Sequence, residues 1–373
     1  MSAAAGGTGG GQQPGAGGSA SASSAPFQPL GPDQQLGAGE AIDLAGRVLG
    51  ATVVACNDQF FADAANLILP HPAVHDPAAF DARGKVYDGW ETRRRRTPGV
   101  DWVVVRLATP GVVERVHVDT AWFRGNYPPH ASVEAAWLPG YPGTDALAAL
   151  DPSAWTPLVP RSDLSGDAVT TFEVSDPRRW THVRLTIHPD GGVARLRVHG
   201  RPVPDPELLT GTIDLLAAEL GGAVVQASDE FYGTAAHLLQ PGRAASMADG
   251  WENARRRDGG HDWVLFSLAA PGRVRRVEVD TSFFVGNAPG RIRLLGTDTR
   301  SSADGRAGDW RELLDLRPQP DTRHVLAVPP SPALTHLLLE AHPDGGMSRL
   351  RLWGELDEDG AALVRQRWDD TRP

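Results

Sequence analysis

The sequence predicts an all-β protein made of two tandem jelly-roll β-sandwich domains. Two observations predict this fold class. Five sequence blocks each occur twice, in the same order, and both copies contain short segments in which apolar and polar residues alternate. Alternation with a period of two is typical of strands that bury one face. Several such strands, separated by turns rich in Gly, Pro and Asp, favour a sandwich or jelly roll.

The repeated blocks show that the chain is duplicated. His188–Gly200 and His342–Gly354 are identical at nine of thirteen positions. The spacing between blocks changes only where loops differ in length, which loops tolerate better than strands do. A period of roughly 160 residues is too long for a solenoid unit, so each copy is predicted to be a domain. The other blocks are 53–61, 88–96, 101–102 and 118–128, which return as 224–232, 249–257, 262–263 and 279–289.

Domain boundaries follow from the repeats and from composition. The Pro-rich segment 201–207 (RPVPDPE) separates the two copies. The N-terminal segment is rich in Gly, Ala and Ser and cannot bury enough apolar surface to fold, so we expect it to be disordered. The segment AALVRQRW near the C-terminus is expected to form a short helix. The predicted regions are a tail at 1–36, a first repeat at 37–203, a second repeat at 204–356 and a C-terminal tail at 357–373.

The expected strands alternate apolar and polar residues between turn signals, whereas helical periodicity is confined to 61–69 and 232–240. The phrase His-Pro-Asp-Gly-Gly at 188–192 lies between two strands, and its Pro, Asp and Gly are typical of a tight turn, so we expect a hairpin. A turn does not require the histidine. The strands are expected at 101–108, 112–119, 132–137, 170–174, 181–188 and 194–200, and at 262–269, 273–280, 291–296, 323–328, 335–342 and 348–354.

Composition limits the possible partners and locations. The net charge of −10 argues against nucleic-acid binding, and no apolar run is long enough to span a membrane. The first basic residue is Arg47, so the N-terminus lacks the features of a secretory or transit signal, and we expect a cytoplasmic protein. The single cysteine, Cys56, excludes an internal disulfide. We expect a small-molecule ligand and a homo-oligomer.

Recurrent ionisable residues are the candidates for catalysis. Histidine has an unperturbed pKa near neutrality and suits a proton donor, while the carboxylates suit a base or metal ligands. Each has a structural alternative: the histidines could only complete a hairpin, and the carboxylates could only pair with neighbouring arginines. The candidate catalytic residues are His188, Glu91 and Asp88 in the first copy and His342, Glu252 and Asp249 in the second.

Recurrent arginines and turn residues are the candidates for substrate binding. A guanidinium can form two parallel hydrogen bonds with a carboxylate, although a run of arginines can also be a solvated surface. The Asp and Asn candidates flank a turn after a strand, where these residue types are also common turn formers. The candidates are Arg94, Arg95, Arg96, Asp119 and Asn126, with Arg255, Arg256, Arg257, Asp280 and Asn287 in the second copy.

Familiar metal-binding and nucleotide-binding motifs are absent from the sequence. No HExxH, CxxC or His-x-His spacing occurs, and no phosphate loop, Rossmann fingerprint or GxSxG elbow is present. A site built from Asp, Glu and His of separate blocks stays open. No cofactor is therefore certain, and a divalent metal is possible.

The blocks together resemble the allantoicase family, from about Gly50 to Gly354. The resemblance rests on NDQFF, DGWETRRRR, DWVVVRLATPG, VDTAWFRGNYP and HPDGGVARLRVHG. It implies two jelly-roll domains similar to galactose-binding sandwiches, and a hydrolase that converts allantoate to ureidoglycolate and urea. The bond broken joins the central carbon to a ureido nitrogen. Such a reaction needs a cation for the carboxylate, an acid for the leaving nitrogen and a base for water.

An alternative from another class is a non-catalytic protein with two ligand-binding or carbohydrate-binding modules, because a sandwich fold does not fix function. A sugar-binding face would need aromatic platforms and few titratable groups. Here Asp, Glu, Arg and His recur together, which favours the hydrolase.

The two copies differ, and if one of them has lost activity, we expect it to be the second. Arg93 corresponds to Ala254, and Arg124 to Val285. Alanine at His188 should abolish urea release from allantoate, whereas alanine at His342 should leave it. A colorimetric urea assay on both variants tests this, and equal loss in the two would reject it.

Overall fold

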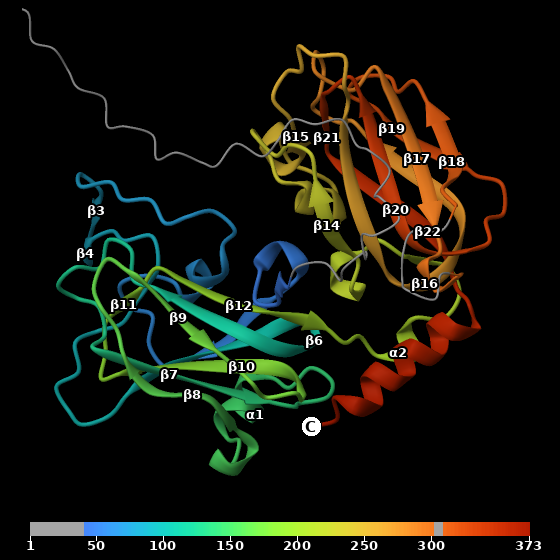
Figure 1. The fold of residues 1–373 in the computed structure, drawn as a ribbon. Coiled ribbons are helices and arrows are strands. Elements are labelled where there is room, and N and C mark those ends of the chain that lie inside the picture. Colours follow the sequence, from blue (N-terminus) through green and yellow to red (C-terminus); the bar gives the residue numbers. More distant parts are fainter. Residues whose placement is uncertain (1–40, 302–308) are drawn as a thin grey trace, which may run out of the picture.

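The computed structural model describes residues 41–301 and 309–373, so the tail predicted at 1–36 lies outside the described residues. Figure 1 shows two β-sandwiches, with the C-terminal helix running between them. Each repeat contains one antiparallel sheet of eight strands that folds over its own core. The all-β tandem sandwich predicted from the sequence is confirmed.

The first repeat has the strand order β1-β12-β6-β10-β7-β8, and β2 and β9 also pair with β6. Its strands are β1 (Ile42–Asp43), β2 (Thr52–Cys56), β3 (Phe80–Asp81), β4 (Gly84–Lys85), β5 (Trp90–Glu91), β6 (Asp101–Asp119), β7 (His130–Ala136), β8 (Thr156–Asp163), β9 (Val169–Glu173), β10 (Arg179–His188), β11 (Gly192–Val193) and β12 (Arg195–Pro202). Its helix is α1 (Thr144–Ala148), and its 3-10 turns are Arg47–Leu49, Ala64–Ile68, Pro152–Ala154 and Pro206–Leu208.

The second repeat has the same topology, with the order β13-β22-β16-β20-β17-β18 and with β14 and β19 on β16. Its strands are β13 (Ile213–Asp214), β14 (Ala223–Ala227), β15 (Trp251–Glu252), β16 (Asp262–Asp280), β17 (Arg291–Thr297), β18 (Arg311–Leu316), β19 (Arg323–Ala327), β20 (Ala333–His342), β21 (Gly346–Met347) and β22 (Arg349–Leu356). Its helix is α2 (Glu358–Asp370), and its 3-10 turns are Ala218–Leu220, Ala235–Leu239, Met247–Asp249 and Thr299–Ser301.

Strand β6 is continuous where the sequence predicted two strands. Its first part pairs with β10 and β2, and its second part pairs with β12 and β9. The strand runs through Pro110 and Gly111, but its pairing with β10 shifts register between Arg106 and Gly111, so these turn-forming residues interrupt the ladder without ending the strand. One strand therefore contributes to both layers of the sandwich, and β16 does the same in the second repeat.

The His-Pro-Asp-Gly-Gly phrase does not form the predicted hairpin. Strand β10 pairs with β6 and β7, whereas β12 pairs with β6 and β1, so β6 lies between the two strands that the phrase connects. The His188–Pro189 and His342–Pro343 peptide bonds are cis. The connection includes β11, which pairs with β5 so that Gly192 lies opposite Glu91. Two repeated blocks are thereby joined directly.

The core of each repeat is filled by the inward residues of these alternating strands. In the first repeat Val103, Val105, Val116 and Leu185 are fully buried, together with Trp90 from β5. Trp251 occupies the same place in the second repeat. The indole N–H groups of both tryptophans donate to backbone carbonyls, of Asp58 and Asp229, at 2.7 and 2.9 Å. These two residues therefore pack as part of the core of their repeats.

The C-terminal segment forms the expected helix, α2, which begins after Asp357, whose side chain accepts a hydrogen bond from the Gly360 N–H. Val364 is buried against the second repeat. At the other end, the Trp368 ring lies 3.6 Å from the Arg179 guanidinium of the first repeat, and the Arg179 N–H donates to the Thr371 carbonyl at 2.8 Å. The helix therefore contacts both sandwiches (Figure 1).

Replacing Gly192 with alanine should destabilise the protein. A Cβ at this position would lie 2.0 Å from a ring carbon of Phe123, which is fully buried and cannot move aside. Overpacking of this kind costs about 1–3 kcal/mol of unfolding free energy. Urea denaturation followed by tryptophan fluorescence measures the change.

Gly125→Ala is the matched control, because a Cβ there would meet nothing within 4 Å. Its unfolding free energy should stay within about 0.5 kcal/mol of the parent. Equal denaturation midpoints for the two variants would contradict the packing described here.

Candidate active site

One end of the first sandwich collects the repeated polar segments. The Gly192 N–H donates to the Asn126 carbonyl at 2.7 Å, and the Thr92 N–H donates to the Gly191 carbonyl at 3.1 Å. The Arg95 N–H donates to the Asp190 carboxylate at 2.8 Å. Three segments that are distant in the sequence, 88–96, 118–128 and 188–192, are thus held together by backbone hydrogen bonds. The corresponding bonds recur in the second repeat, where the Gly346 N–H donates to Asn287 and the Arg256 N–H to Asp344.

Glu91 and Asn126 form the central side-chain pair of this end. The Asn126 amide donates to Glu91 Oε1 at 2.7 Å. Burial raises the pKa of the Glu91 carboxyl, and the hydrogen bond from Asn126 only partly offsets this effect. The same pair recurs as Glu252 and Asn287, at 2.5 Å. Two of the sequence candidates in each copy are therefore brought together.

The three consecutive arginines have different roles. The Arg95 side chain donates from Nε to the buried carboxylate of Asp101 at 2.9 Å, and Arg256 does the same to Asp262. Asp101 and Asp262 begin the long strands, so these two guanidiniums fasten the arginine segment to the sheet. The remaining arginines are exposed and form no hydrogen bond or ion pair with other described residues: Arg94, Arg96, Arg255 and Arg257.

Asp88 and Asp249 hold loops in place. Asp88 Oδ2 accepts from the buried guanidinium of Arg195 at 2.8 Å and from the Val74 N–H at 2.9 Å. Burial raises the pKa of Asp88, but the hydrogen bonds from Arg195 and Val74 and the positive charge of Arg195 together outweigh it, so the pKa lies below its usual value. Asp249 Oδ2 accepts from the backbone N–H groups of Ala245 and Ser246. Both carboxylates therefore have structural partners.

Asp119 and Asp280 complete turns at the ends of the long strands. Asp119 Oδ1 accepts from the Ala121 N–H at 2.7 Å, and Asp280 Oδ1 accepts from the Ser282 N–H at 2.9 Å. These contacts are typical of turn-forming residues, which was the structural alternative to a role of Asp119 and Asp280 in substrate binding.

His188 lies at the end of β10, beside the first residues of β7. Its Nε2 is 3.0 Å from Ser132 Oγ, and burial lowers its pKa. No hydrogen bond or ion pair joins it to Glu91 within the described residues. His342, its counterpart, instead contacts Glu340 at 3.2 Å. The two histidines therefore have different surroundings in the two repeats.

Two ionisable residues near His342 were missed by the sequence analysis. His261 and Glu340 lie with His342 in one cluster, although neither belongs to a recurrent set of polar positions. The search relied on recurrence, and the aligned first-repeat positions hold Val100 and Thr186. The sequence signal that could have identified them is that His261 and Glu340 are ionisable whereas Val100 and Thr186 are not.

A separate cavity of about 570 Å³ lies between the repeats, lined by residues that include Arg201, Ala269 and Arg367. None of the sequence-predicted site residues lines this cavity. The recurrent polar residues therefore belong to the individual sandwiches. Within 41–301 and 309–373, no helix is long and apolar enough to cross a membrane.

The fold and the duplicated polar ends place the chain among tandem jelly-roll proteins whose two halves are copies of one unit. A family model described as the allantoicase repeat matches residues 42–203 and again residues 213–357. The chain belongs to the allantoicase family.

Individual relatives cover nearly the whole of both repeats. A probable allantoicase of Streptomyces coelicolor is 48% identical over 338 residues, which are 87% of this chain and 88% of that protein. A probable allantoicase of Nocardia farcinica is 50% identical over 323 residues, covering 85% and 95%. The crystal structure of allantoicase from Saccharomyces cerevisiae superposes with a TM-score of 0.73 at 34% identity, covering 84% and 93%.

Removing the Arg95 guanidinium should destabilise the first repeat. Arg95→Met would leave the Asp101 carboxylate buried, with a side chain only 2% exposed, and without its cation. Loss of one partner of a buried ion pair costs about 3–5 kcal/mol. Thermal and urea unfolding of the variant measure the loss.

Arg94→Ala serves as the comparison, because that side chain is exposed and unpaired. Its stability should change by less than about 0.5 kcal/mol. Similar losses in both variants would mean that the Arg95–Asp101 pair does not fasten this segment.

Proposed function

We propose that the allantoicase reaction of this chain, hydrolysis of allantoate to ureidoglycolate and urea, takes place at the polar end of the first repeat. Glu91 is the proton donor, Asn126 holds Glu91 and binds a ureido group, and Arg94 binds the substrate carboxylate. The observation that carries this proposal is the half-buried Glu91–Asn126 pair, with the guanidinium of Arg94, which pairs with no described residue, three positions after Glu91.

Hydrolysis of allantoate requires a general acid that protonates the leaving ureido nitrogen. The product retains one ureido group and gains a hydroxyl on the central carbon, so the bond from that carbon to the other ureido nitrogen breaks. Urea leaves only when this nitrogen gains a proton. Because burial raises the pKa of Glu91, a larger fraction of its carboxyl is protonated near neutral pH than for an exposed glutamate. The Asn126 amide fixes one carboxyl oxygen and leaves the other for the substrate.

Binding of the substrate carboxylate requires a cationic side chain that is not already paired with a carboxylate of the protein. Arg93 is paired with Asp58 at 2.8 Å, and Arg95 is paired with Asp101. Arg94 lies between them in the chain and has no partner in the part of the chain that the structure describes. A planar guanidinium can donate two parallel hydrogen bonds to a carboxylate, which both binds and orients the substrate.

Activation of water is assigned to His188. Burial lowers the pKa of its imidazole, so the ring is neutral at physiological pH and can accept a proton. This differs from the proton-donor role expected from the sequence. Within the described residues His188 contacts Ser132 and not Glu91, so the assignment rests on the chemistry of the imidazole and on its position at the same end of the sandwich.

The first repeat is preferred because the matching residues of the second contact other side chains. The Asn287 amide lies 3.4 Å from the Met247 sulfur, in addition to its bond with Glu252. His342 is held by the Glu340 carboxylate. A cytoplasmic location and a homo-oligomeric state stay predictions from the sequence.

Glu91→Gln should lower kcat/KM for allantoate by about 100-fold to 10,000-fold, because the amide cannot donate the required proton in the same way.

Arg94→Ala should mainly raise KM, by about 10-fold or more, because a hydrogen bond to a charged group is lost. A urea-release assay over a range of allantoate concentrations measures both values.

Glu252→Gln distinguishes one active repeat from two, and we expect it to keep most of the parent activity. A loss equal to that of Glu91→Gln would overturn the assignment to the first repeat. If the folded parent chain bound allantoate but released no urea, the non-catalytic alternative would replace this proposal.

A further inference from the structure

The second repeat carries a cluster of two histidines and one glutamate that the first repeat lacks. Glu340 and His342 are alternate residues of β20 and therefore point to the same face of the sheet. His261 immediately precedes β16, whose Asp262 lies opposite Ala341, so His261 lies across from His342. The two imidazole rings stack with centroids 4.2 Å apart and an interplanar angle of 28°.

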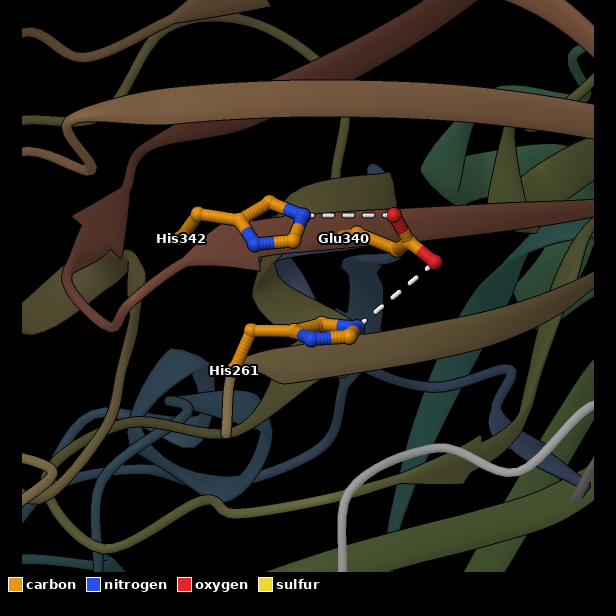
Figure 2. Close-up of side chains that lie close together, drawn as sticks. All are labelled: His261, Glu340 and His342. Carbon is orange, nitrogen blue, oxygen red and sulfur yellow. Dashed lines mark hydrogen bonds and ion pairs between the residues drawn. The ribbon is translucent and has the colours of Figure 1, made fainter. Parts of the chain in front are cut away.

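The donor atoms of the three side chains converge. Figure 2 shows the Nε2 atoms of the two rings directed at different oxygens of Glu340. His261 Nε2 lies 3.6 Å from Oε1, and His342 Nε2 lies 3.2 Å from Oε2. One ligand atom from each residue falls within 4.8 Å of the other two. Ligands of a tetrahedral zinc ion lie about 3.4 Å apart, so only small movements would complete such a site.

His261 gives an independent indication of a ligand site. Its Nε2 atom is buried and makes no hydrogen bond with the described residues. The Glu340 oxygen at 3.6 Å is beyond hydrogen-bonding distance. Both Nε2 atoms face the same carboxylate, and the one of His261 is buried and lies beyond hydrogen-bonding distance of it, which is the position of a metal ligand.

The carboxylate of the cluster is held in place by a neighbouring guanidinium. Arg293 donates to Glu340 Oε2 at 2.9 Å and also pairs with Glu312, which orients the carboxylate from outside the cluster.

The sandwich itself does not require these residues. The equivalent positions in the first repeat hold Val100 and Thr186, and Ser132 replaces Arg293 in the same register. Only the histidine is shared, and there it contacts Ser132. Among the described residues, this cluster is the one group of His, Cys, Asp or Glu with spacing suited to a metal.

We propose that His261, Glu340 and His342 bind one divalent transition-metal ion of the zinc type, and that water fills the remaining positions. Two imidazoles and one carboxylate favour zinc and related ions over calcium or magnesium, which prefer oxygen ligands. The three side chains are 20%, 9% and 29% exposed, so solvent reaches the cluster. The site does not depend on the proposed catalytic roles of the first repeat.

Zinc binding by the full-length, untagged chain tests the proposal. After dialysis against a chelator, isothermal titration with zinc chloride should give one tight site per chain, and elemental analysis should find one zinc after gel filtration. Cobalt(II) at the same site should give the visible absorption of a tetrahedral nitrogen–oxygen complex. His261→Ala and Glu340→Gln should each weaken zinc binding by more than roughly 100-fold, because loss of a ligand exceeds the effect of losing a neighbour of a ligand.

His188→Ala is the matched control, since it removes the first-repeat counterpart of His342 and should leave zinc binding unchanged. Circular dichroism of the metal-free variants checks that each is folded, and Glu340→Gln keeps the shape of the side chain if His261→Ala does not fold. The proposal is overturned if the parent chain binds no zinc tightly, or if folded Glu340→Gln binds it as the parent does. Those outcomes would leave the cluster as a hydrogen-bonded ion pair only.

Discussion

The guanidinium of Arg95, bound to the buried carboxylate of Asp101, holds the polar end of the first sandwich together. The carboxylate also accepts from the Asn57 amide at 3.0 Å, and the Arg95 backbone N–H reaches Asp190 in the turn after β10. This one residue thus ties the arginine segment to the start of β6 and to the connection that carries β11. Arg256 repeats the arrangement with Asp262 and Asp344. Since Glu91 lies four residues before Arg95 and pairs with the same connection, its orientation depends on this network.

Much of the fold could be predicted from the sequence because its strands follow local rules. Alternation of buried and exposed residues and the order of the blocks are properties of neighbouring residues, and they were sufficient for the tandem sandwich. The continuity of β6 across Pro110 and the crossover after His188 depend on which strands pair, and pairing joins residues far apart in the chain. A Pro-Asp-Gly-Gly sequence is compatible with a hairpin and with a crossover alike.

The candidate site was predictable in part for the same reason. Recurrence identified Glu91 and Asn126, which do meet. Recurrence could not tell that Arg95 forms a buried ion pair whereas Arg94 is exposed. Adjacent residues of the same type differ only in the neighbours that the fold gives them. Recurrence could not identify His261 and Glu340, because these residues occur in one copy only and a search for positions shared by both copies excludes them. Divergence between the copies is the complementary signal, and it marks the outer face of β20.

Two separate connections join the sandwiches. The chain passes once from the first repeat to the second through the segment after β12, and α2 then returns so that Trp368 covers Arg179. Two domains joined by a linker alone could rotate about it. Here α2 also contacts the linker turn Pro206–Leu208, and the 3-10 turn Ala218–Leu220 of the second repeat contacts β6 and β12 of the first. The mutual orientation of the halves is therefore fixed by non-covalent contacts on and around the linker, and not by the covalent connection alone.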